Sequence, residues 1–309
     1  MQTTIVYTVP HLAYWDWRVA ADLFFGGIGV GAFLFALLVD WRYQGKYRRI
    51  CQTGAVMAPL FVVVGLLFLL SEMGHPFRVV YTLTTVQLKS PLWWGGIFQS
   101  VFILGTLVYA YQWFWPEQSA TARQWVGWLT LPVALIVGAY HGLLLSAIRA
   151  RPLWSTGPTT VAALLGFLTT GIAAVMVIHL VRMKLAGRLA NQAWVVEFLT
   201  DMREVRNILG AALLLQLFTF FIWWLSLLLG MQPAQQALAT ANASWGPWFW
   251  FGAIGVGLVL PLLLGGVAMV RGSRIGNALE INTIWVTSGL ILVGGFIFRL
   301  AVVLGGQMA

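Results

Sequence analysis

The stretch WRVAADLFFGGIGVGAFLFALLV at residues 17–39 has two charged side chains near its start and is otherwise apolar or glycine. As an α-helix rising about 1.5 Å per residue, it would be about 35 Å long, enough to cross a hydrocarbon core of about 30 Å. Similar apolar runs recur along the sequence between charges and turn residues. They predict further membrane-spanning helices at residues 53–72, 92–114, 125–147, 159–181, 207–230, 247–270 and 279–303.

These spans predict an all-α, polytopic integral membrane protein in which residues 1–309 form a single membrane domain. In lipid, every backbone N–H and C=O must pair within its own segment, which favours helices despite the many β-branched residues. The composition is 60% hydrophobic and 9% charged, and it includes 17 tryptophans. Ordinary soluble domains carry about a quarter charged residues, so a soluble fold is excluded. Tryptophan collects at membrane interfaces.

The net charge of +9 predicts a topology rather than a nucleic-acid partner, because no basic face or nucleic-acid motif accompanies it. An even number of crossings places both termini on one side, and most Lys and Arg residues fall on the other. The positive-inside rule therefore predicts a bacterial inner (cytoplasmic) membrane protein with periplasmic N- and C-termini. The charged segment from Arg182 to Arg206 has the spacing of a short amphipathic helix lying at the cytoplasmic interface.

The sequence predicts no metal site, haem or iron–sulfur cluster in this protein. Its single cysteine, Cys51, cannot hold a cluster, which needs several thiolates. Of the four histidines, only His75 and His141 could pair across a haem iron. Their expected depths differ by about 10 Å, whereas axial ligands need matched depth.

Several polar side chains lie in or beside the spans, where charge is costly and often marks function. They are all expected toward the periplasmic end. Structural readings also exist: Arg78 could anchor a helix at the headgroups or pair with Glu72, and Arg299 could snorkel to the interface. Tyr140 could be an ordinary packed aromatic residue. The candidates are Asp22, Glu72, His75, Arg78, Tyr140, His141 and Arg299.

Five motifs spread over the sequence show a resemblance to a known family. The most specific is YHGLLLS at residues 140–146, followed by RPLWST at residues 151–156. The opening WDW at residues 15–17 with ADLFFGG at residues 21–27 is another. The runs EMGHPFR (72–78) and SPLWWGG (90–96), and the ending from GGF (294–296) through Arg299 to Gly306, are similar too. Together they resemble the polysulfide reductase membrane subunit family, also called NrfD/PsrC.

The resemblance implies an eight-helix, haem-free subunit that binds menaquinone or ubiquinone near a docking face. A ferredoxin-like iron–sulfur subunit would dock there, on the periplasmic side and over the loop from Met73 to Leu92, and it would connect to a molybdopterin catalytic subunit. Tyr140 would contact the quinone ring directly. The other implied roles are proton exchange for His141, Glu72 and His75, and contacts to the quinone or orientation of its pocket for Asp22, Arg299 and Arg78.

The function predicted on this basis is a quinol/quinone-binding membrane anchor that exchanges electrons between the quinone pool and the iron–sulfur partner. The complex would be an oxidoreductase of the polysulfide, thiosulfate or dimethyl sulfoxide reductase type, working in anaerobic respiration. Two alternatives stay open. A secondary transporter would place its substrate site near the midplane on broken helices. A purely structural anchor would bind no quinone.

Overall fold

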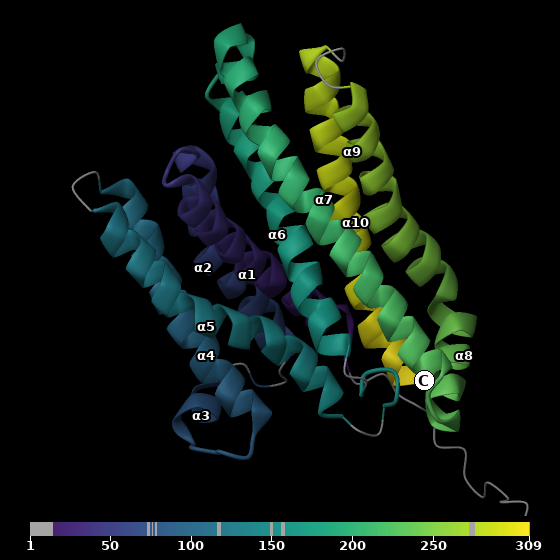
Figure 1. Ribbon diagram of the computed structural model, residues 1–309. Helices are drawn as coiled ribbons and strands as arrows, with labels where there is room; N and C mark the ends of the chain where they lie inside the picture. Colours follow the sequence, from purple (N-terminus) through teal and green to yellow (C-terminus); the bar gives the residue numbers. More distant parts are fainter. Residues whose placement is uncertain are drawn as a thin grey trace, which may run out of the picture.

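The computed structural model describes residues 15–72, 75, 77, 79–115, 119–148, 151–155, 158–271 and 276–308. Within these ranges every regular element is helical, as predicted, and the long helices run side by side (Figure 1). Arg78, Arg149 and residues 1–14 lie outside the described residues.

In the described part of the protein, 8 helical segments are long and apolar enough to cross a membrane, which confirms the predicted number of spans. Two short helices, α3 (Val79–Thr84) and the 3₁₀ turn η2 (Arg188–Ala190), lie between spans. The spans are α1 (Trp17–Tyr43), α2 (Arg48–Glu72), α4 (Pro91–Phe114), α5 (Ala120–Ser146), α6 (Pro158–Leu185), α7 (Gln192–Leu228), the continuous unit of α8 (Gln232–Pro247), η3 (Trp248–Val259) and α9 (Leu260–Arg271), and α10 (Asn277–Met308).

The prediction of a separate interfacial helix between Arg182 and Arg206 is wrong. After η2, helix α7 begins at Gln192 and continues for 37 residues without a break. Apolar side chains recur at intervals of three and four residues through this segment, so it buries the same stripe as the span that follows. The stripe consists of Val195, Phe198, Leu199, Met202 and Val205.

The seventh span begins at Gln232, earlier than the predicted residue 247. The sequence PAQQALATANAS at residues 233–244 is too polar to be recognised from hydropathy. Its alanines nevertheless favour a helix, since alanine has the highest helix propensity. The polypeptide continues from α8 through the π-helical segment η3, 12 residues long, into α9.

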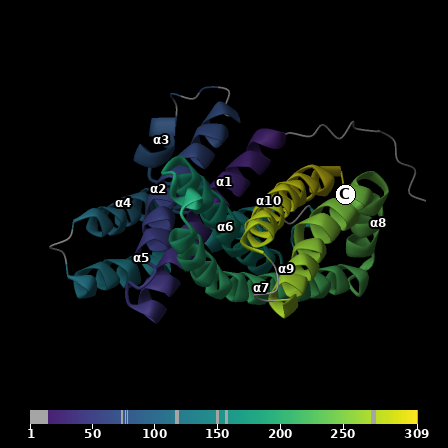
Figure 2. The same cartoon turned by 90° about the horizontal axis from the view of Figure 1, so that it is seen from above.

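Helix α1 lies at the centre of the molecule. It packs against α2, α5, α6 and α10, and it is the most enclosed of the 8 spans. Seen from above, α4 and α5 lie at one edge and α8 and α9 at the other (Figure 2). The described ends meet: the Trp15 N–H donates to Gln307 Oε1 at 2.9 Å, and Gln307 Nε2 donates to the Trp15 carbonyl at 2.8 Å.

Glycine lets the backbones of α1 and α6 touch. A Cβ on Gly171 would lie 2.5 Å from the nitrogen of Ala32 and 2.6 Å from the Cα of Gly31. Nonbonded carbon atoms prefer separations of about 3.5–4.0 Å, so no larger residue fits without moving a helix. Small residues at such crossings are typical of membrane helix packing.

We predict that Gly171→Ala separates α1 from α6 and lowers the midpoint of thermal unfolding in detergent. Overpacking of this kind costs about 1–3 kcal/mol. Gly210→Ala is the matched control, because no atom lies within 4 Å of a Cβ at Gly210. That control should be neutral or stabilising by up to about 1 kcal/mol, since alanine favours the helix. Equal midpoints for the two variants would contradict the close contact.

Candidate functional site

Three helices bring four of the predicted residues together near the end of the bundle where Trp15 and Gln307 meet. Asp22 comes from α1, Tyr140 and His141 from α5, and Arg299 from α10. A Cβ at Gly26 would lie 3.5 Å from His141 Nε2 and 4.0 Å from Asp22 Oδ1. The His141 imidazole and the Asp22 carboxylate therefore both lie next to the backbone of Gly26.

The neutral His141 imidazole is held in one tautomer by its own helix. Its Nδ1 lies 2.7 Å from the Val137 carbonyl. Because a carbonyl can only accept, Nδ1 carries the proton and Nε2 presents a lone pair. The residue is 2% exposed, and Nε2 has no hydrogen-bond partner among the residues that the structure describes. A buried acceptor without a partner is costly, so this atom is suited to receive a proton or a donor.

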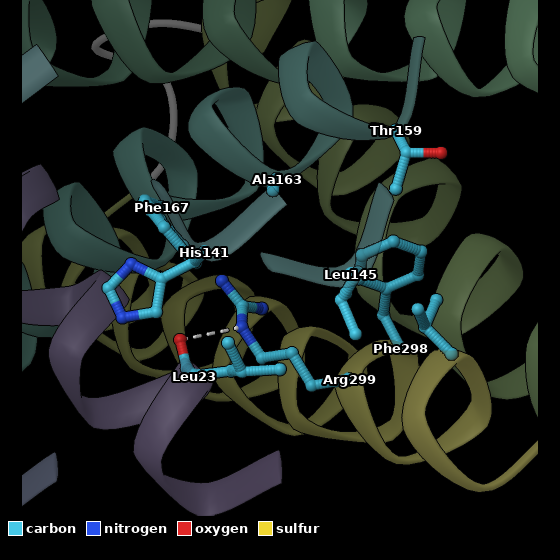
Figure 3. A pocket seen from close by; sticks show the side chains of 9 residues that line it. Leu23, His141, Leu145, Thr159, Ala163, Phe167, Phe298 and Arg299 are labelled. Atoms are coloured by element: carbon cyan, nitrogen blue, oxygen red, sulfur yellow. Dashed lines mark hydrogen bonds between the residues drawn. The ribbon is translucent and has the colours of Figure 1, made fainter. Parts of the chain in front are cut away.

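A small cavity of about 30 Å³ lies beside His141 and Arg299 (Figure 3). Its other walls are apolar apart from Thr159. A water molecule needs about 10–15 Å³ measured in this way, so the cavity can hold water but no aromatic ring. The lining residues are Leu23, His141, Leu145, Thr159, Ala163, Phe167, Phe298, Arg299 and Val302.

Arg299 points into the protein and does not snorkel, since the residue is 4% exposed. Its Nη1 donates to the Gly295 carbonyl at 2.6 Å, and its Nε donates to the Leu23 carbonyl at 3.3 Å (Figure 3). The guanidinium carbon also lies over the rings of Phe24 and Phe167, at 5.4 and 5.2 Å from their centres. Among the described residues, no carboxylate forms an ion pair with it. Arg299 therefore brings a guanidinium to the site that is not paired directly with a described acid.

Tyr140 is half-buried at the contact between α4 and α5. Its ring packs edge-on against His141, with 5.7 Å between ring centres. Its phenol lies on Gly95 of α4, where any Cβ would overlap the phenolic Cζ and oxygen. Glycine at this position therefore sets where the hydroxyl can lie.

Glu72 lies at the end of α2 and pairs with Arg18 of α1. Arg18 Nη2 is 2.6 Å from Glu72 Oε2, and Arg18 Nη1 donates to the Ser71 carbonyl. Arg18 also holds Asp16, the N-cap of α1. Burial acts to raise the pKa of Asp16, but the hydrogen bonds and charge of Arg18 outweigh it and lower the pKa. This network joins α1 to α2 outside the polar cluster.

Besides Glu72, one described candidate, His75, is not brought into the cluster. His75 is exposed in the loop after α2, whereas His141 is buried. Arg78 lies outside the described residues. Within the described ranges, no three His, Cys, Asp or Glu side chains are grouped as a metal ion would require.

The sequence did not reveal the pairing of a second buried polar group, near the opposite ends of α1 and α5. Arg123 donates to Asp40 through Nε at 2.9 Å and Nη2 at 2.8 Å. Its guanidinium carbon lies 3.8 Å from the ring centre of Trp113, and the Tyr109 hydroxyl donates to Asp40 at 3.4 Å. An acid in the last turn of one span and an arginine in the first turn of another are the only signals in the sequence.

The fold and the cluster define a multi-pass helical membrane protein with buried polar side chains grouped near one end of its bundle. A family model described as polysulphide reductase, NrfD, matches residues 7–309. The protein therefore belongs to the NrfD family of polysulphide reductase proteins, which confirms the resemblance seen in the motifs.

The sequence is also similar to individual proteins over most of its length. It is 24% identical to Protein NrfD of Escherichia coli, over 95% of both proteins. It is 24% identical to one of the polypeptides of the polysulfide reductase of Wolinella succinogenes, over 95% of this sequence and 94% of the relative. It is 24% identical to one of the subunits of the selenate reductase of Mesobacillus selenatarsenatis, over 84% of this sequence and 68% of the relative.

For the second polar group, we predict that Arg123→Ala strongly destabilises the protein, because it leaves the Asp40 carboxylate buried without its partner. Breaking a buried pair costs about 3–5 kcal/mol. Replacing both residues by leucine should recover most of that loss, since no charge then stays buried. Thermal unfolding in detergent measures the effect, with Arg42→Ala on the exposed surface as control. A double variant no more stable than Arg123→Ala would argue against the pair.

Proposed function

We propose that this protein is the haem-free, quinol/quinone-binding membrane anchor of a respiratory reductase complex in the bacterial inner membrane. It exchanges electrons between the membrane quinone pool, menaquinone or ubiquinone, and a ferredoxin-like iron–sulfur subunit linked to a molybdopterin catalytic subunit. Membership of the NrfD family supports this proposal, as do relatives named as parts of polysulfide and selenate reductases.

The observation that carries the proposal is the free Nε2 of His141 beside Tyr140 and Asp22. A quinol that gives up two electrons also releases two protons, so its site needs a hydrogen-bonding group and proton acceptors. Tyr140 supplies a hydroxyl and His141 an unprotonated nitrogen. A purely structural anchor has no use for a buried acceptor without a partner.

In the proposed mechanism, the Tyr140 hydroxyl donates to one quinone oxygen and so positions the ring. Nε2 of His141 exchanges one proton, because the Val137 carbonyl holds the other ring nitrogen in its protonated form. The Asp22 carboxylate exchanges the second proton. Arg299 favours negative charge on an oxygen that has lost its proton. The quinone carries the redox chemistry, and the protein supplies these positions.

The size of the enclosed cavity restricts where the ring can lie. The cavity beside His141 and Arg299 accepts water only, whereas Tyr140 is half-buried and keeps an accessible face. The ring therefore binds against Tyr140, at the contact of α4 with α5. Water in the cavity exchanges protons with His141 on the side away from the ring.

The iron–sulfur partner docks on the side of the membrane that carries the site, which the charge distribution assigns to the periplasm together with both termini. The loop after α2 and the short helix α3 present apolar side chains there. Phe77 is 94% exposed, Tyr81 65% and Val80 57%. Exposed aromatic side chains are characteristic of protein interfaces.

We predict that Tyr140→Phe, made in the assembled complex, lowers quinol-linked turnover by about tenfold. The lost hydroxyl leaves a buried quinone oxygen without its donor, which costs about 1–3 kcal/mol. Affinity for a quinone-like inhibitor should fall in parallel. Tyr111→Phe is the control. Tyr111 is 52% exposed and lies in the C-terminal half of α4, whereas Gly95, which contacts Tyr140, lies in the N-terminal half. Full turnover and unchanged inhibitor affinity in Tyr140→Phe would refute the assignment.

We also predict that Gly95→Ala lowers quinol-linked turnover, because the added methyl group displaces the Tyr140 phenol. The losses of the double variant Gly95→Ala with Tyr140→Phe should be less than additive, since the Tyr140 hydroxyl can be lost only once. Gly289→Ala on α10 is the control, as no atom lies within 4 Å of a Cβ there. Strictly additive losses would show that Gly95 does not act through Tyr140.

A further inference from the structure

A lipid-facing groove runs along the contact between α4 and α5, on the same pair of helices as Tyr140 and Gly95. Its volume is about 360 Å³. All of its lining side chains except Thr130 are apolar, and the Thr130 hydroxyl donates to the Val126 carbonyl of its own helix at 2.8 Å. The lining residues are Val101, Leu104, Gly105, Val108, Val126, Leu129, Thr130 and Val133.

The groove begins where a tail attached to a ring at Tyr140 would pass. Val133 precedes Tyr140 by seven residues, about 10.5 Å along α5, and Val101 follows Gly95 by six residues, about 9 Å along α4. Both walls therefore continue from the contact between Gly95 and Tyr140 toward the middle of the membrane. The groove is open to lipid, because Leu104 is 64% exposed and Leu129 is 73% exposed.

We propose that this groove holds the isoprenoid tail of the quinone, with the ring at Tyr140; this inference rests on the proposed function. A polar substrate would gain nothing from such walls, whereas an isoprenoid tail seated between them gains binding through close packing of apolar atoms. The protein would thus select long-tailed quinones over tail-less analogues.

A second, larger groove lies on the other flank of α4, against α2. Its volume is about 760 Å³, and it too is apolar. Its lining residues come from α2 and α4 and not from α5, the helix of Tyr140, and on α4 they begin only at Ile103. This second groove therefore provides a control surface of the same chemistry. Its lining residues are Val56, Pro59, Leu60, Val63, Ile103, Leu107, Val108, Ala110, Tyr111 and Phe114.

The test fills the first groove and compares two substrates in the assembled complex. Val101→Trp should raise the KM for a long-tailed menaquinol by about tenfold and leave kcat unchanged, because it removes binding that is equal in the ground and transition states. Turnover of a tail-less quinol analogue should not change. Leu60→Trp, in the second groove, should leave both substrates unaffected.

Three results would overturn the inference. They are an unchanged KM for the long-tailed quinol in Val101→Trp, an equal loss with the tail-less analogue, and a raised KM in Leu60→Trp instead. Leu129→Trp fills the groove from α5 and replaces Val101→Trp if that variant does not assemble. Failure of the proposed function has a different signature, in which Tyr140→Phe affects neither substrate.

Discussion

Hydrocarbon offers no hydrogen-bond partners, and this constraint governs both the fold and the site. Backbone groups satisfy it by forming helices throughout the described spans. Hydroxyl side chains satisfy it inside their own helices, as when Thr106 donates to the Phe102 carbonyl and Thr287 donates to the Thr283 carbonyl. His141 satisfies only one of its two ring nitrogens in this way. Gln112 Oε1 and Trp113 Nε1 of α4 are also buried without a partner among the described residues, but His141 Nε2 is the one that lies beside Asp22, Tyr140 and Arg299.

The two buried polar regions of the bundle differ in charge balance. Near one end, the Asp40 carboxylate is matched by the guanidinium of Arg123. Near the other end, Arg299 is surrounded by carbonyl oxygens and aromatic rings in place of an acid. A matched pair stabilises a single arrangement of helices. An unmatched cation creates a field that a bound molecule can respond to, and in the proposed function that molecule is the quinone.

Most of the fold could be predicted from the sequence because hydropathy reports directly on burial in lipid. Hydropathy failed to predict the helix where it is polar, as in α8. It also failed to predict where a span begins when an amphipathic segment joins it without a break, as at Gln192. The depth of a residue within its helix could also be predicted, which is why Asp22, Tyr140, His141 and Arg299 were correctly expected near one end. Contacts between helices could not, because sequence distance says nothing about which faces meet.

The partners of the predicted residues were accordingly the part of the site that was hardest to predict from the sequence. In the described part of the protein, Glu72 pairs with Arg18 of α1, a residue far from it in the sequence. The contact of the Tyr140 phenol with Gly95 could not be predicted, because the sequence shows only a glycine near the start of a helix. The Val137 carbonyl accepts from His141 Nδ1 because the two residues are one helical turn apart. This contact can be inferred only after the segment is known to be a helix.

The link between α1 and α10 has a consequence for biosynthesis. Arg299 donates to the Leu23 carbonyl, and Gln307 exchanges two hydrogen bonds with Trp15. Proteins fold from the N-terminus as they are made, so these contacts of α1 cannot form until α10 has been inserted. A stalled or shortened nascent polypeptide can contain the other spans and still lack a closed site. Insertion of α10 is thus the step that completes the cluster of Asp22, Tyr140, His141 and Arg299.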